Sequence, residues 1–543
     1  MATLLDTPVG ADEVAAPKPS ARSEPGPVIR HWRTIAICAA LAVTCAVATA
    51  FNVYGNPVRF KDEGVYLAQA WAIPHLGALA HYTYWYDHPP LGWIQMSLWA
   101  TLTGGWDRWS EQTTMAGREF MIVARVATCL LIYALGRRMG MRRSWSVIAV
   151  LVFVFSPLAM YYGRLTLLDN VAMPWVLASL VLAWSPRRAW SAAIGSAMCF
   201  TVAVMTKETL VLLAPAILLA LWSNYRRCAN RHFVWVSFGL VLAMSVALYP
   251  LYAMIKSELI PGVGHVSLFG ALEWQLSARK GSGSVFDPAS DARTLVDSWL
   301  ALDMWLPLGG LVAAALLMGD RRLRPIIVAL AIQAAMLLRQ GYLPSMYVVA
   351  MLPFCALAVA GLCDRLWPRS AVPPVDPQGN TVARHRDQGH AGLRKGASCA
   401  AALLVVLFWC TAVTTAGSSW ANTLRYQWTV DEDASQRQVI AWLRDHVPHD
   451  SVVVAEGEMW LDLHNAGFQG PNNVWVYKVD SDPEVTERLS SWRSIDYLAL
   501  SRITLVSESR ATMPMVFEAL EHGEQVAEFG TANDAVVIMK VKR

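Results

Sequence analysis

The chain has 543 residues, of which 55% are hydrophobic and only 16% are charged, and its mean hydropathy is +0.35. These values exclude a soluble globular protein and indicate a polytopic membrane protein. The net charge of +4 is small and lies in short basic clusters between apolar runs, so nothing in it points to nucleic acid. Nine cysteines lie in or beside apolar segments, without the spacing of a disulfide framework or a metal site.

Residues 1–30 are rich in Ala, Pro, Ser and charge, and they lack an early apolar stretch. This composition predicts a disordered cytoplasmic leader rather than a cleaved signal peptide. The first apolar run, residues 34–52, then serves as an uncleaved membrane anchor.

An acidic pair, Asp62 and Glu63, follows this first span, and a polar aromatic loop over residues 81–93 comes next. Charge at a membrane surface is costly unless it is solvated or paired, so the pair is a candidate site. Glu63 has a second interpretation, because acidic residues favour the first turn of a helix and residues 64–73 predict one.

Eleven apolar runs are candidate membrane spans, whereas Leu91 to Thr103 is about 13 residues long and is interpreted as re-entrant or interfacial. The predicted spans are residues 34–52, 118–136, 144–161, 170–184, 190–205, 209–223, 233–253, 299–318, 325–338, 345–362 and 397–416. This count places the basic clusters on the cytoplasmic side, with the N-terminus inside and the C-terminal region outside.

Several polar segments then share the extracytoplasmic face, as a membrane-surface site for a charged ligand would require. They are the outer loop 53–117, the turn with Arg164 and Asp169, the turn with Lys207, the outer loop 254–298, and the turn with Arg339 and Tyr342. Within loop 254–298, Arg279, Lys280 and the Gly-rich residues after them favour a plain linker over a lid.

From Asp431 the pattern changes to alternating helix-like and strand-like runs, typical of a compact α/β domain. A helix is predicted over 431–447, with strands over 451–455, 474–477, 495–500 and 535–539. The predicted organisation is a leader (1–30), a membrane domain (31–416) and a soluble extracytoplasmic α/β domain (417–543). The C-terminal domain carries four polar residues that match no nucleophile or metal signature: Glu456, Glu458, Asp462 and His464. This favours loop or acceptor contacts over direct catalysis.

The sequence resembles the GT-C glycosyltransferases that use polyprenyl-phosphate sugars, which include protein O-mannosyltransferases and lipid A aminoarabinose transferases. The resemblance covers about residues 34–360 and rests on short motifs in a common order. These are Asp62-Glu63, His88-Pro89-Pro90-Leu91-Gly92, Arg164 with Leu168-Asp169, Thr206-Lys207, and Tyr342-Leu343-Pro344. The C-terminal stretch resembles the tail of an actinobacterial branch of this superfamily, of the family 39 type.

One departure concerns the end of the first outer loop. Aminoarabinose transferases tend to carry an acidic residue and a lysine before the proline, whereas this chain has Asp87-His88, closer to the mannosyltransferase pattern. A phosphate-binding lysine therefore cannot be transferred to that position.

The resemblance implies a mainly α-helical GT-C membrane fold and transfer of a sugar to an acceptor hydroxyl, with inversion. Asp62 is the expected general base, and Asp169 would orient Arg164 or the acceptor, or share a divalent ion with Asp62. Cations suited to the leaving phosphate are Lys207, Arg164 and Arg339. Expected substrate contacts are Glu63, Tyr82, Tyr84, Trp85, Asp87, His88 and Tyr342.

Each of these residues also has a structural interpretation. Lys207 fits a side chain that snorkels from a turn, and Arg164 with Asp169 fits an ion pair. His88 equally fits an ordinary loop histidine, and the loop aromatics fit interfacial anchors.

The expected partners are a polyprenyl-phosphate sugar donor, membrane lipid and a glycan, lipid or protein acceptor, with no cofactor required and a divalent cation left open. The expected location is the plasma membrane. Two other functions stay open: a transporter or flippase of a lipid-linked or anionic solute, and a noncatalytic envelope assembly protein. The absence of an internal repeat, together with charges in turns on one face, favours the transferase.

Overall fold

The computed structural model describes residues 27–262, 265–367, 403, 407, 410–411, 414–531 and 535–542. The chain divides into residues 1–40 and a compact unit of residues 41–543, and the contacts given below lie within the second unit. Residues 1–26 of the predicted leader and most of the predicted last span, residues 397–416, lie outside the described residues.

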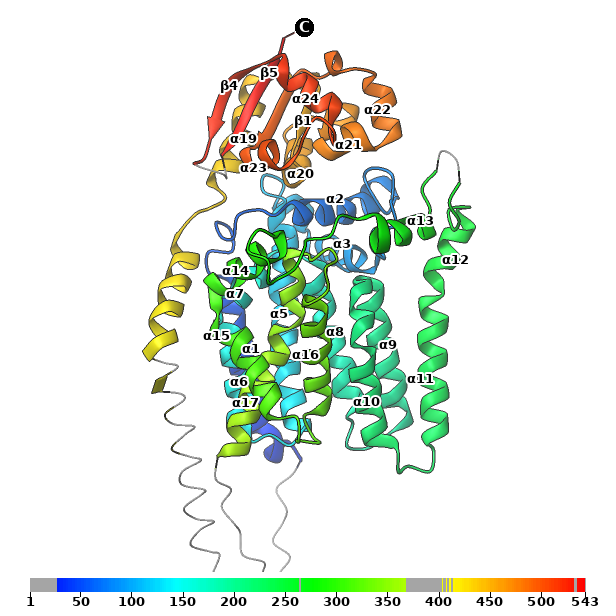
Figure 1. The fold of residues 1–543 in the computed structure, drawn as a ribbon, viewed down its shortest axis with the longest axis vertical. Helices are drawn as coiled ribbons and strands as arrows, with labels where there is room; N and C mark the ends of the chain where they lie inside the picture. Colours follow the sequence, from blue (N-terminus) through cyan, green and yellow to red (C-terminus); the bar gives the residue numbers. More distant parts are fainter. Residues whose placement is uncertain are drawn as a thin grey trace, which may run out of the picture. The chain divides into compact units, whose positions relative to one another are not determined.

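Ten of the eleven predicted spans coincide with apolar helices (Figure 1). By length and composition five helices can cross a membrane, or up to seven if each of two bent pairs is one span, and α8, α9 and α16 are shorter apolar helices. The helices are α1 (Pro27–Ala50), α5 (Thr114–Arg138), α6 (Arg143–Phe155), α7 (Pro157–Arg164), α8 (Leu168–Ala183), α9 (Trp190–Thr206), α10 (Ala214–Tyr225), α11 (Arg231–Val246), α12 (Leu248–Ile255), α14 (Asp291–Asp303), α15 (Trp305–Leu316), α16 (Arg324–Leu337) and α17 (Leu352–Leu366), with the short η1 (Glu208–Leu213) and η3 (Ser345–Ala350) leading into α10 and α17.

Two predicted spans are bent rather than continuous, which corrects the expectation for residues 144–161 and 299–318. The angle between α6 and α7 is 65° and that between α14 and α15 is 99°. At the first bend Ser156 caps α7 by accepting from the Ala159 amide, and a proline follows it. At the second bend Asp303 Oδ1 accepts from the amides of Trp305 and Leu306, which starts a new helix.

Two helices of the first outer loop contact the ends of the membrane helices without crossing. They are α2 (Lys61–Leu76) and α3 (Leu91–Thr103), followed by the single turn α4 (Gly105–Arg108). Residues Leu91–Thr103 form a helix of 13 residues, the predicted length, and its re-entrant or interfacial placement stays a prediction. Helix α3 packs on α5, α8 and α9, and the second outer loop contributes α13 (Leu268–Glu273) and the π-helical turn η2 (Trp274–Ala278).

The C-terminal region forms a five-stranded mixed sheet in the order β2-β1-β3-β5-β4. Strands β1, β2 and β3 are parallel, and β5 runs antiparallel to both β3 and β4. The strands are β1 (Val453–Ala455), β2 (Asn473–Trp475), β3 (Tyr497–Ser501), β4 (Gly523–Phe529) and β5 (Val536–Val541), and the helices are α19 (Ala434–His446), η4 (Gly457–Met459), α20 (Trp460–Asn465), η5 (Gly470–Asn472), α21 (Val476–Ser481), α22 (Pro483–Leu489), η6 (Trp492–Ser494), α23 (Arg502–Ser507) and α24 (Pro514–Glu521).

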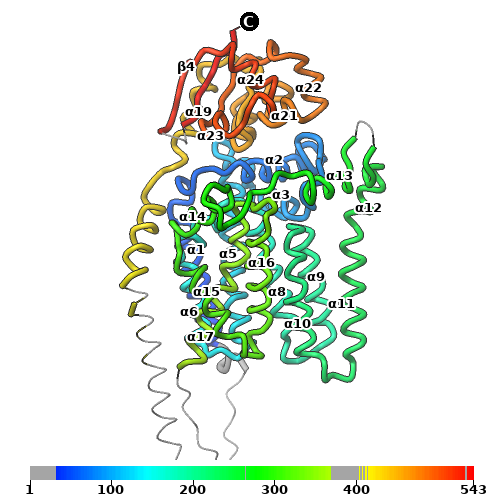
Figure 2. The backbone as a smooth tube through the Cα atoms, in the orientation of Figure 1, coloured from blue at the N-terminus to red at the C-terminus, as the bar shows by residue number. Residues whose placement is uncertain are grey.

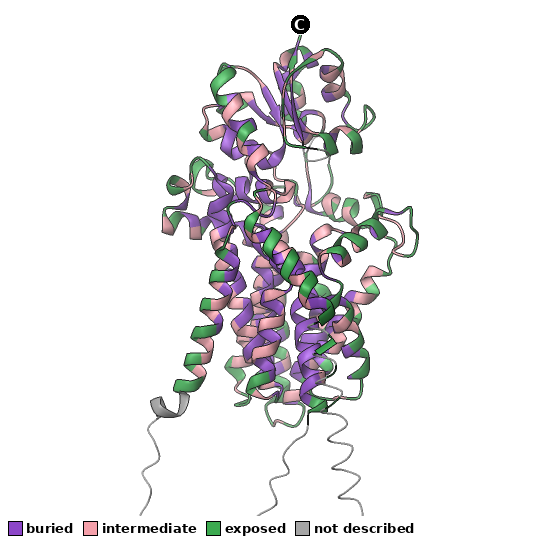
Figure 3. Ribbon diagram, turned by 90° about the vertical axis from the view of Figure 1, so that its left-hand side faces the viewer, coloured by how far each residue is buried: buried purple, intermediate pink, exposed green. Residues whose placement is uncertain are grey.

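Apolar side chains cover both faces of this sheet, which explains its four predicted strands. Val454 and Leu498 belong to one apolar core, and Val453 and Ile538, on the other face, belong to a second. The central strands are coloured as buried in Figure 3. Strand β4 was not predicted, because an edge strand exposes polar residues and lacks the apolar pattern of the central strands. The predicted domain boundary at 416/417 falls inside a helix over residues 414–429.

Helix α2 is tied to the membrane helices by a buried ion pair. Arg118 of α5 donates to both oxygens of Glu63 at 2.9 Å, and neither side chain is exposed. Glu63 Oε1 also accepts from the amide (3.0 Å) and hydroxyl (2.9 Å) of Thr166. A buried carboxylate with this many partners fixes the start of α2 on the ends of α5 and α7.

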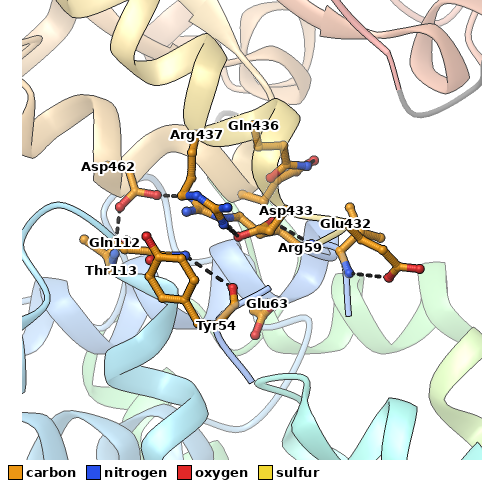
Figure 4. A network of polar contacts seen from close by, with 12 residues as sticks. Tyr54, Arg59, Glu63, Gln112, Thr113, Glu432, Asp433, Gln436, Arg437 and Asp462 are labelled. Atoms are coloured by element: carbon orange, nitrogen blue, oxygen red, sulfur yellow. Dashed lines mark hydrogen bonds and ion pairs between the residues drawn. The ribbon is translucent and has the colours of Figure 1, made fainter. Parts of the chain in front are cut away.

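On its other side, α2 and the segment before it hold the C-terminal domain. Arg59 is buried between Asp433, at 2.8 Å, and Asp462 (Figure 4). The blue segment before α2 runs beside the yellow segment before α19 (Figure 2). The Glu432 amide donates to the Gly55 carbonyl there at 2.7 Å. A Cβ on Gly64 would lie 2.2 Å from the Cα of Glu458, so only glycine allows η4 to approach α2 this closely.

Replacing Arg118 by leucine is expected to destabilise the protein by about 3 to 5 kcal/mol, because Glu63 would keep a buried charge without its cation. Thermal unfolding of the purified protein in detergent measures this. The matched control is Asp297→Ala, which breaks the exposed Arg293–Asp297 pair and should leave the unfolding temperature unchanged. Equal unfolding temperatures for the Arg118→Leu variant and the wild type would contradict the structural role of the pair.

Candidate active site

Asp62, in the first turn of α2, faces charged side chains from three other segments. Lys207 follows α9, Asp87 and His88 precede α3, and Arg279 lies in the second outer loop; all four act electrostatically on Asp62. Burial raises the pKa of the Asp62 carboxyl above its ordinary value, and Lys207 and His88 oppose that rise. By accessible surface the Asp62 side chain is half-buried, and a partly desolvated carboxylate beside fixed cations is an arrangement typical of active sites.

Lys207 is held at this place by a short hydrogen-bonded chain. Its backbone is extended where α9 ends, and its side chain is almost fully buried. The Lys207 ammonium donates to His88 Nε2 at 3.1 Å, and His88 Nδ1 lies 2.9 Å from Glu208 Oε2. Because Nε2 accepts, we assign the ring proton to Nδ1, which donates to Glu208. The predicted residues Lys207 and His88 therefore belong to one unit with Glu208, which the sequence had not singled out.

Asp169 lies in the first turn of α8, and Lys207 is the charge that acts on it most strongly. Its side chain is buried, and Oδ2 has no hydrogen-bond partner in the described part of the chain. Oδ1 of Asp87 is also buried and has no hydrogen-bond partner in the described part of the chain. Buried carboxylate oxygens without a donor are rare and costly, so a water molecule or a ligand that donates hydrogen bonds would stabilise these two.

A metal ion would need further ligands here. Among the described residues no three His, Cys, Asp or Glu side chains lie close enough together to hold one. The divalent ion considered between Asp62 and Asp169 would thus depend on ligands from the substrate.

A second part of the site consists of Arg279 and Tyr342, which contact each other. The Arg279 guanidinium lies 3.3 Å from the centre of the Tyr342 ring, and its Nη1 donates to Gln275 at 2.8 Å. The structure thus places the predicted residue Tyr342 near Asp62. Arg279 was read only as part of a polar linker, and nothing in the sequence separates it from its neighbour Lys280.

Arg164, a predicted phosphate ligand, instead contacts the backbone. Its guanidinium is buried and donates to carbonyl oxygens of Ala48, Thr49 and Phe51 at the end of α1, and to that of Gln427. A cation at the C-terminal end of a helix satisfies its unpaired carbonyls. Arg164 therefore joins α7 to α1 and the helix over residues 414–429.

Two other predicted site residues also make different contacts. The Glu63 carboxylate receives hydrogen bonds from Arg118 and Thr166, as described above. Arg339 is exposed, and its guanidinium lies against Gly341, where a Cβ would be 2.7 Å away.

The aromatic loop divides between the site and the C-terminal domain. Tyr84 donates to the His88 carbonyl at 2.7 Å and pairs with the Tyr249 hydroxyl at 2.8 Å, which positions the loop before α3. Tyr82 donates to the Asn473 carbonyl, and the Lys478 ammonium lies 3.8 Å above the Trp85 ring. Tyr82 and Trp85, which were expected to contact substrate, thus also contact the C-terminal domain.

The polar residues singled out in the C-terminal domain face α2. Asp462 binds Arg59 and accepts from the Thr113 amide at 2.7 Å, and Glu456 accepts from the Ser501 amide and hydroxyl. Burial, together with the neighbouring Glu456 carboxyl, raises the pKa of Glu458 to about 8. These contacts agree with the interpretation of these side chains as acceptors.

A groove of about 1030 Å³ lies between the membrane helices and the first outer loop, and Asp62, His88 and Lys207 are not among its lining residues. Its membrane part is lined by Thr201 and Met205 of α9 and by Ser245 of α11. Its outer part is lined by Tyr84 and Pro90, which lie on either side of His88 along the chain. We call this cavity the membrane groove.

The family model of dolichyl-phosphate-mannose-protein mannosyltransferases matches residues 87–252. An undecaprenyl phosphate-alpha-4-amino-4-deoxy-L-arabinose arabinosyl transferase of Proteus mirabilis is 24% identical over 194 residues, which are 35% of this chain and 33% of that protein. The match thus spans about a third of the relative's length.

Two solved structures share the architecture over most of the chain. ArnT from Cupriavidus metallidurans, bound to undecaprenyl phosphate, has a TM-score of 0.54 at 14% identity, covering 94% of this chain and 98% of that one. The oligosaccharyltransferase AglB from Archaeoglobus fulgidus, in complex with an inhibitory peptide and a dolichol-phosphate, has a TM-score of 0.51 at 10% identity, covering 94% and 76%. The chain has the GT-C glycosyltransferase fold. The predicted resemblance is thereby confirmed.

In this GT-C fold the matched segment, residues 87–252, carries Asp87, His88, Asp169 and Lys207. Asp62 precedes the segment and Arg279 follows it. The site is therefore completed by the two flanking regions of the chain.

The raised pKa of Asp62 predicts a pH-dependent stability. Between the unfolded and folded pKa values the folded chain binds more protons, so its stability falls as pH rises through this window. Asp62→Asn should therefore unfold at a higher temperature than wild type at pH 7, and the gain should shrink toward pH of about 4, near the unfolded pKa. Calorimetry at several pH values tests this, and a loss of stability at pH 7 would refute the desolvation of Asp62.

Proposed function

We propose that this GT-C protein transfers a sugar from a polyprenyl-phosphate donor to an acceptor hydroxyl on the extracytoplasmic face of the plasma membrane. The observation that carries the proposal is the half-buried Asp62 within electrostatic range of the hydrogen-bonded Lys207–His88 pair. The relatives support the donor class: one is named as an undecaprenyl phosphate-linked arabinosyl transferase, and one solved structure holds undecaprenyl phosphate.

The membrane groove suits the lipid part of the donor. Its apolar lining, which includes Ile94 of α3 and Leu248 of α12, would hold part of a polyprenyl chain, and Tyr84 and Pro90 line it on either side of His88 along the chain. Lys207 and Arg279 are then the two cations placed to bind the phosphate, because both act on Asp62. We accordingly assign Arg164 and Arg339 no phosphate contact.

The residues support a single displacement. The acceptor hydroxyl oxygen attacks the anomeric carbon while Asp62 removes its proton, and the bond from that carbon to the phosphate oxygen breaks. The phosphate leaves with the bonding electron pair, and Lys207 and Arg279 stabilise the charge that develops on it. Attack on the face opposite the phosphate inverts the configuration. Asp169 and Asp87, with their free oxygens, would bind sugar or acceptor hydroxyls.

The arrangement of the helix ends supports the proposed orientation. The α5 end near Thr114 adjoins the C-terminal domain through the Thr113–Asp462 contact, and its other end carries Arg137 and Arg138. Basic residues favour the cytoplasmic side, so Asp62 and the C-terminal domain belong outside, with the N-terminus inside.

Asp62→Asn is expected to lower transfer roughly 10² to 10⁴-fold, because the amide cannot accept the hydroxyl proton. The measurement is the release of lipid phosphate from a labelled polyprenyl-phosphate sugar by protein in nanodiscs. The matched control is Asp297→Asn, which changes an exposed acidic residue of the outer loop and should keep the wild-type rate of lipid phosphate release. Undiminished turnover in Asp62→Asn would rule out the base assignment, and movement of the donor across the bilayer without turnover would favour a transporter.

Lys207→Met should shift the acid limb of the pH–rate profile to higher pH. Lys207 lowers the pKa of Asp62, and the base works only when ionised, so loss of the cation raises the pH needed for activity. The profile of kcat against pH for the residual activity measures the shift, with Arg293→Gln as the control. An unchanged midpoint would place Lys207 outside the electrostatic range of the base.

A further inference from the structure

A second cavity, of about 370 Å³, lies between α2, the aromatic loop and the C-terminal domain. We call it the aromatic cleft. It is lined by rings and polar groups from all three parts of the molecule, namely Trp71, Leu76, His81, Tyr82, Thr83, Trp460, His464, Gly470, Pro471, Asn473, Asp482, Glu484, Val485 and Arg488. It shares residues 81–83 with the membrane groove, so the two cavities lie on either side of that segment.

The walls of the aromatic cleft are largely rings. Trp71, Tyr82 and Trp460 line it together with the imidazoles of His81 and His464. The rings hold one another in place: the centre of the Trp460 ring lies 4.3 Å from that of His81, and the centre of Trp71 lies 4.7 Å from that of His464. Such rigid aromatic walls present apolar surface with little loss of side-chain entropy on binding.

Four polar atoms in these walls have no hydrogen-bond partner in the described structure, and one of them, Oδ2 of the buried Asp482, forms an ion pair with Lys478 at 3.4 Å, so three neutral ones remain. They are Nδ1 of His81, Nδ1 of His464 and Oδ1 of Asn473, whose side chain is only 2% exposed. Burial and the nearby Lys478 lower the pKa of His81 to about 3, and burial also lowers the pKa of His464. Both imidazoles are therefore neutral, and each offers one donor and one acceptor. Neutral groups of this kind match hydroxyls better than they match anions.

The open side of the cleft is polar and of mixed charge. Glu484 and Arg488 lie on α22, four residues apart, and both are exposed. A polyanion would call for a basic rim, whereas a carboxylate and a guanidinium together can bind hydroxyls from both sides.

The cleft also disfavours a peptide bound as an added strand. Strand β2 is the edge of the sheet beside it. Its backbone is already occupied, because Tyr82 donates to the Asn473 carbonyl and accepts from the Trp475 amide at 2.9 Å. Strand addition needs a free edge.

The cleft lies at a distance from Asp62 that helix α2 sets. Trp71 follows Asp62 by nine residues on the same helix, which corresponds to roughly 14 Å at 1.5 Å per residue. One sugar cannot occupy both places, but a chain of sugars can extend from the cleft to the base.

We propose that the aromatic cleft binds the acceptor, and that this acceptor is a neutral carbohydrate chain whose terminal hydroxyl reaches Asp62. The proposal rests on the proposed function and adds the acceptor class to it. Inner sugars would stack on Trp71, Tyr82 or Trp460 and donate to or accept from His81, His464 and Asn473.

The test compares short and long acceptors in the full-length protein in nanodiscs. The probes are mannose, mannotetraose, arabinose and arabinotetraose, and the test variant is His81→Phe combined with His464→Phe, which keeps the rings but removes their nitrogens. Binding without donor is read by tryptophan fluorescence, and release of lipid phosphate is read separately. Asp297→Asn is the control, and a second variant, Arg488→Ala, tests the exposed rim without touching the core.

We expect one of the tetrasaccharides to bind at least tenfold more tightly than its monosaccharide, and this advantage to be lost in the His variant and reduced in Arg488→Ala. Binding of the tetrasaccharide and release of lipid phosphate should both stay at the wild-type level in the Asp297→Asn control. Equal binding by wild type and both variants, no binding of either tetrasaccharide, or binding of a serine-rich peptide in their place would overturn the carbohydrate assignment. If the wild type released no lipid phosphate, the proposed function would be overturned instead. Binding of the tetrasaccharides without donor would still test the cleft.

Discussion

Two buried charged side chains, Arg59 and Glu63, hold one short segment of the chain through ion pairs, and the candidate site depends on this segment. Arg59 is bound by Asp433 and Asp462 of the C-terminal domain, and four residues later Glu63 is bound by Arg118 of α5. Each pair removes charges from water and is stable only while its partners stay in place. The segment between them carries Asp62, so both the membrane helices and the C-terminal domain determine where that carboxylate lies.

The adjacent acids Asp62 and Glu63 show how environment separates two similar groups. Glu63 accepts hydrogen bonds from Arg118 and Thr166 and so belongs to the scaffold. Asp62 has no direct hydrogen bond within the described structure, and burial raises its pKa. A carboxyl whose pKa is shifted toward neutrality and whose oxygens are free is suited to proton transfer.

The C-terminal domain is a structural part of the site region rather than an independent module. It contacts α2 through Gly64 and the aromatic loop through Tyr82 and Lys478. Substrate bound between the domain and α2 would therefore lie close to the base, which links the proposed acceptor cleft to the proposed chemistry.

The sequence by itself determined the membrane class, the helical spans, the four apolar strands and the acidic pair, because these depend on local composition and period. It also marked Lys207 and His88 as neighbours of the site. It could not predict the bend at Asp303 or the exposed edge strand β4. Nor could it predict the different contacts of Arg164 and Arg279, because the sequence around an arginine does not show whether carbonyls or a carboxylate surround its side chain. Only the tertiary structure decided those contacts, because the partners of a charged side chain lie far away along the chain and its protonation and role follow from burial.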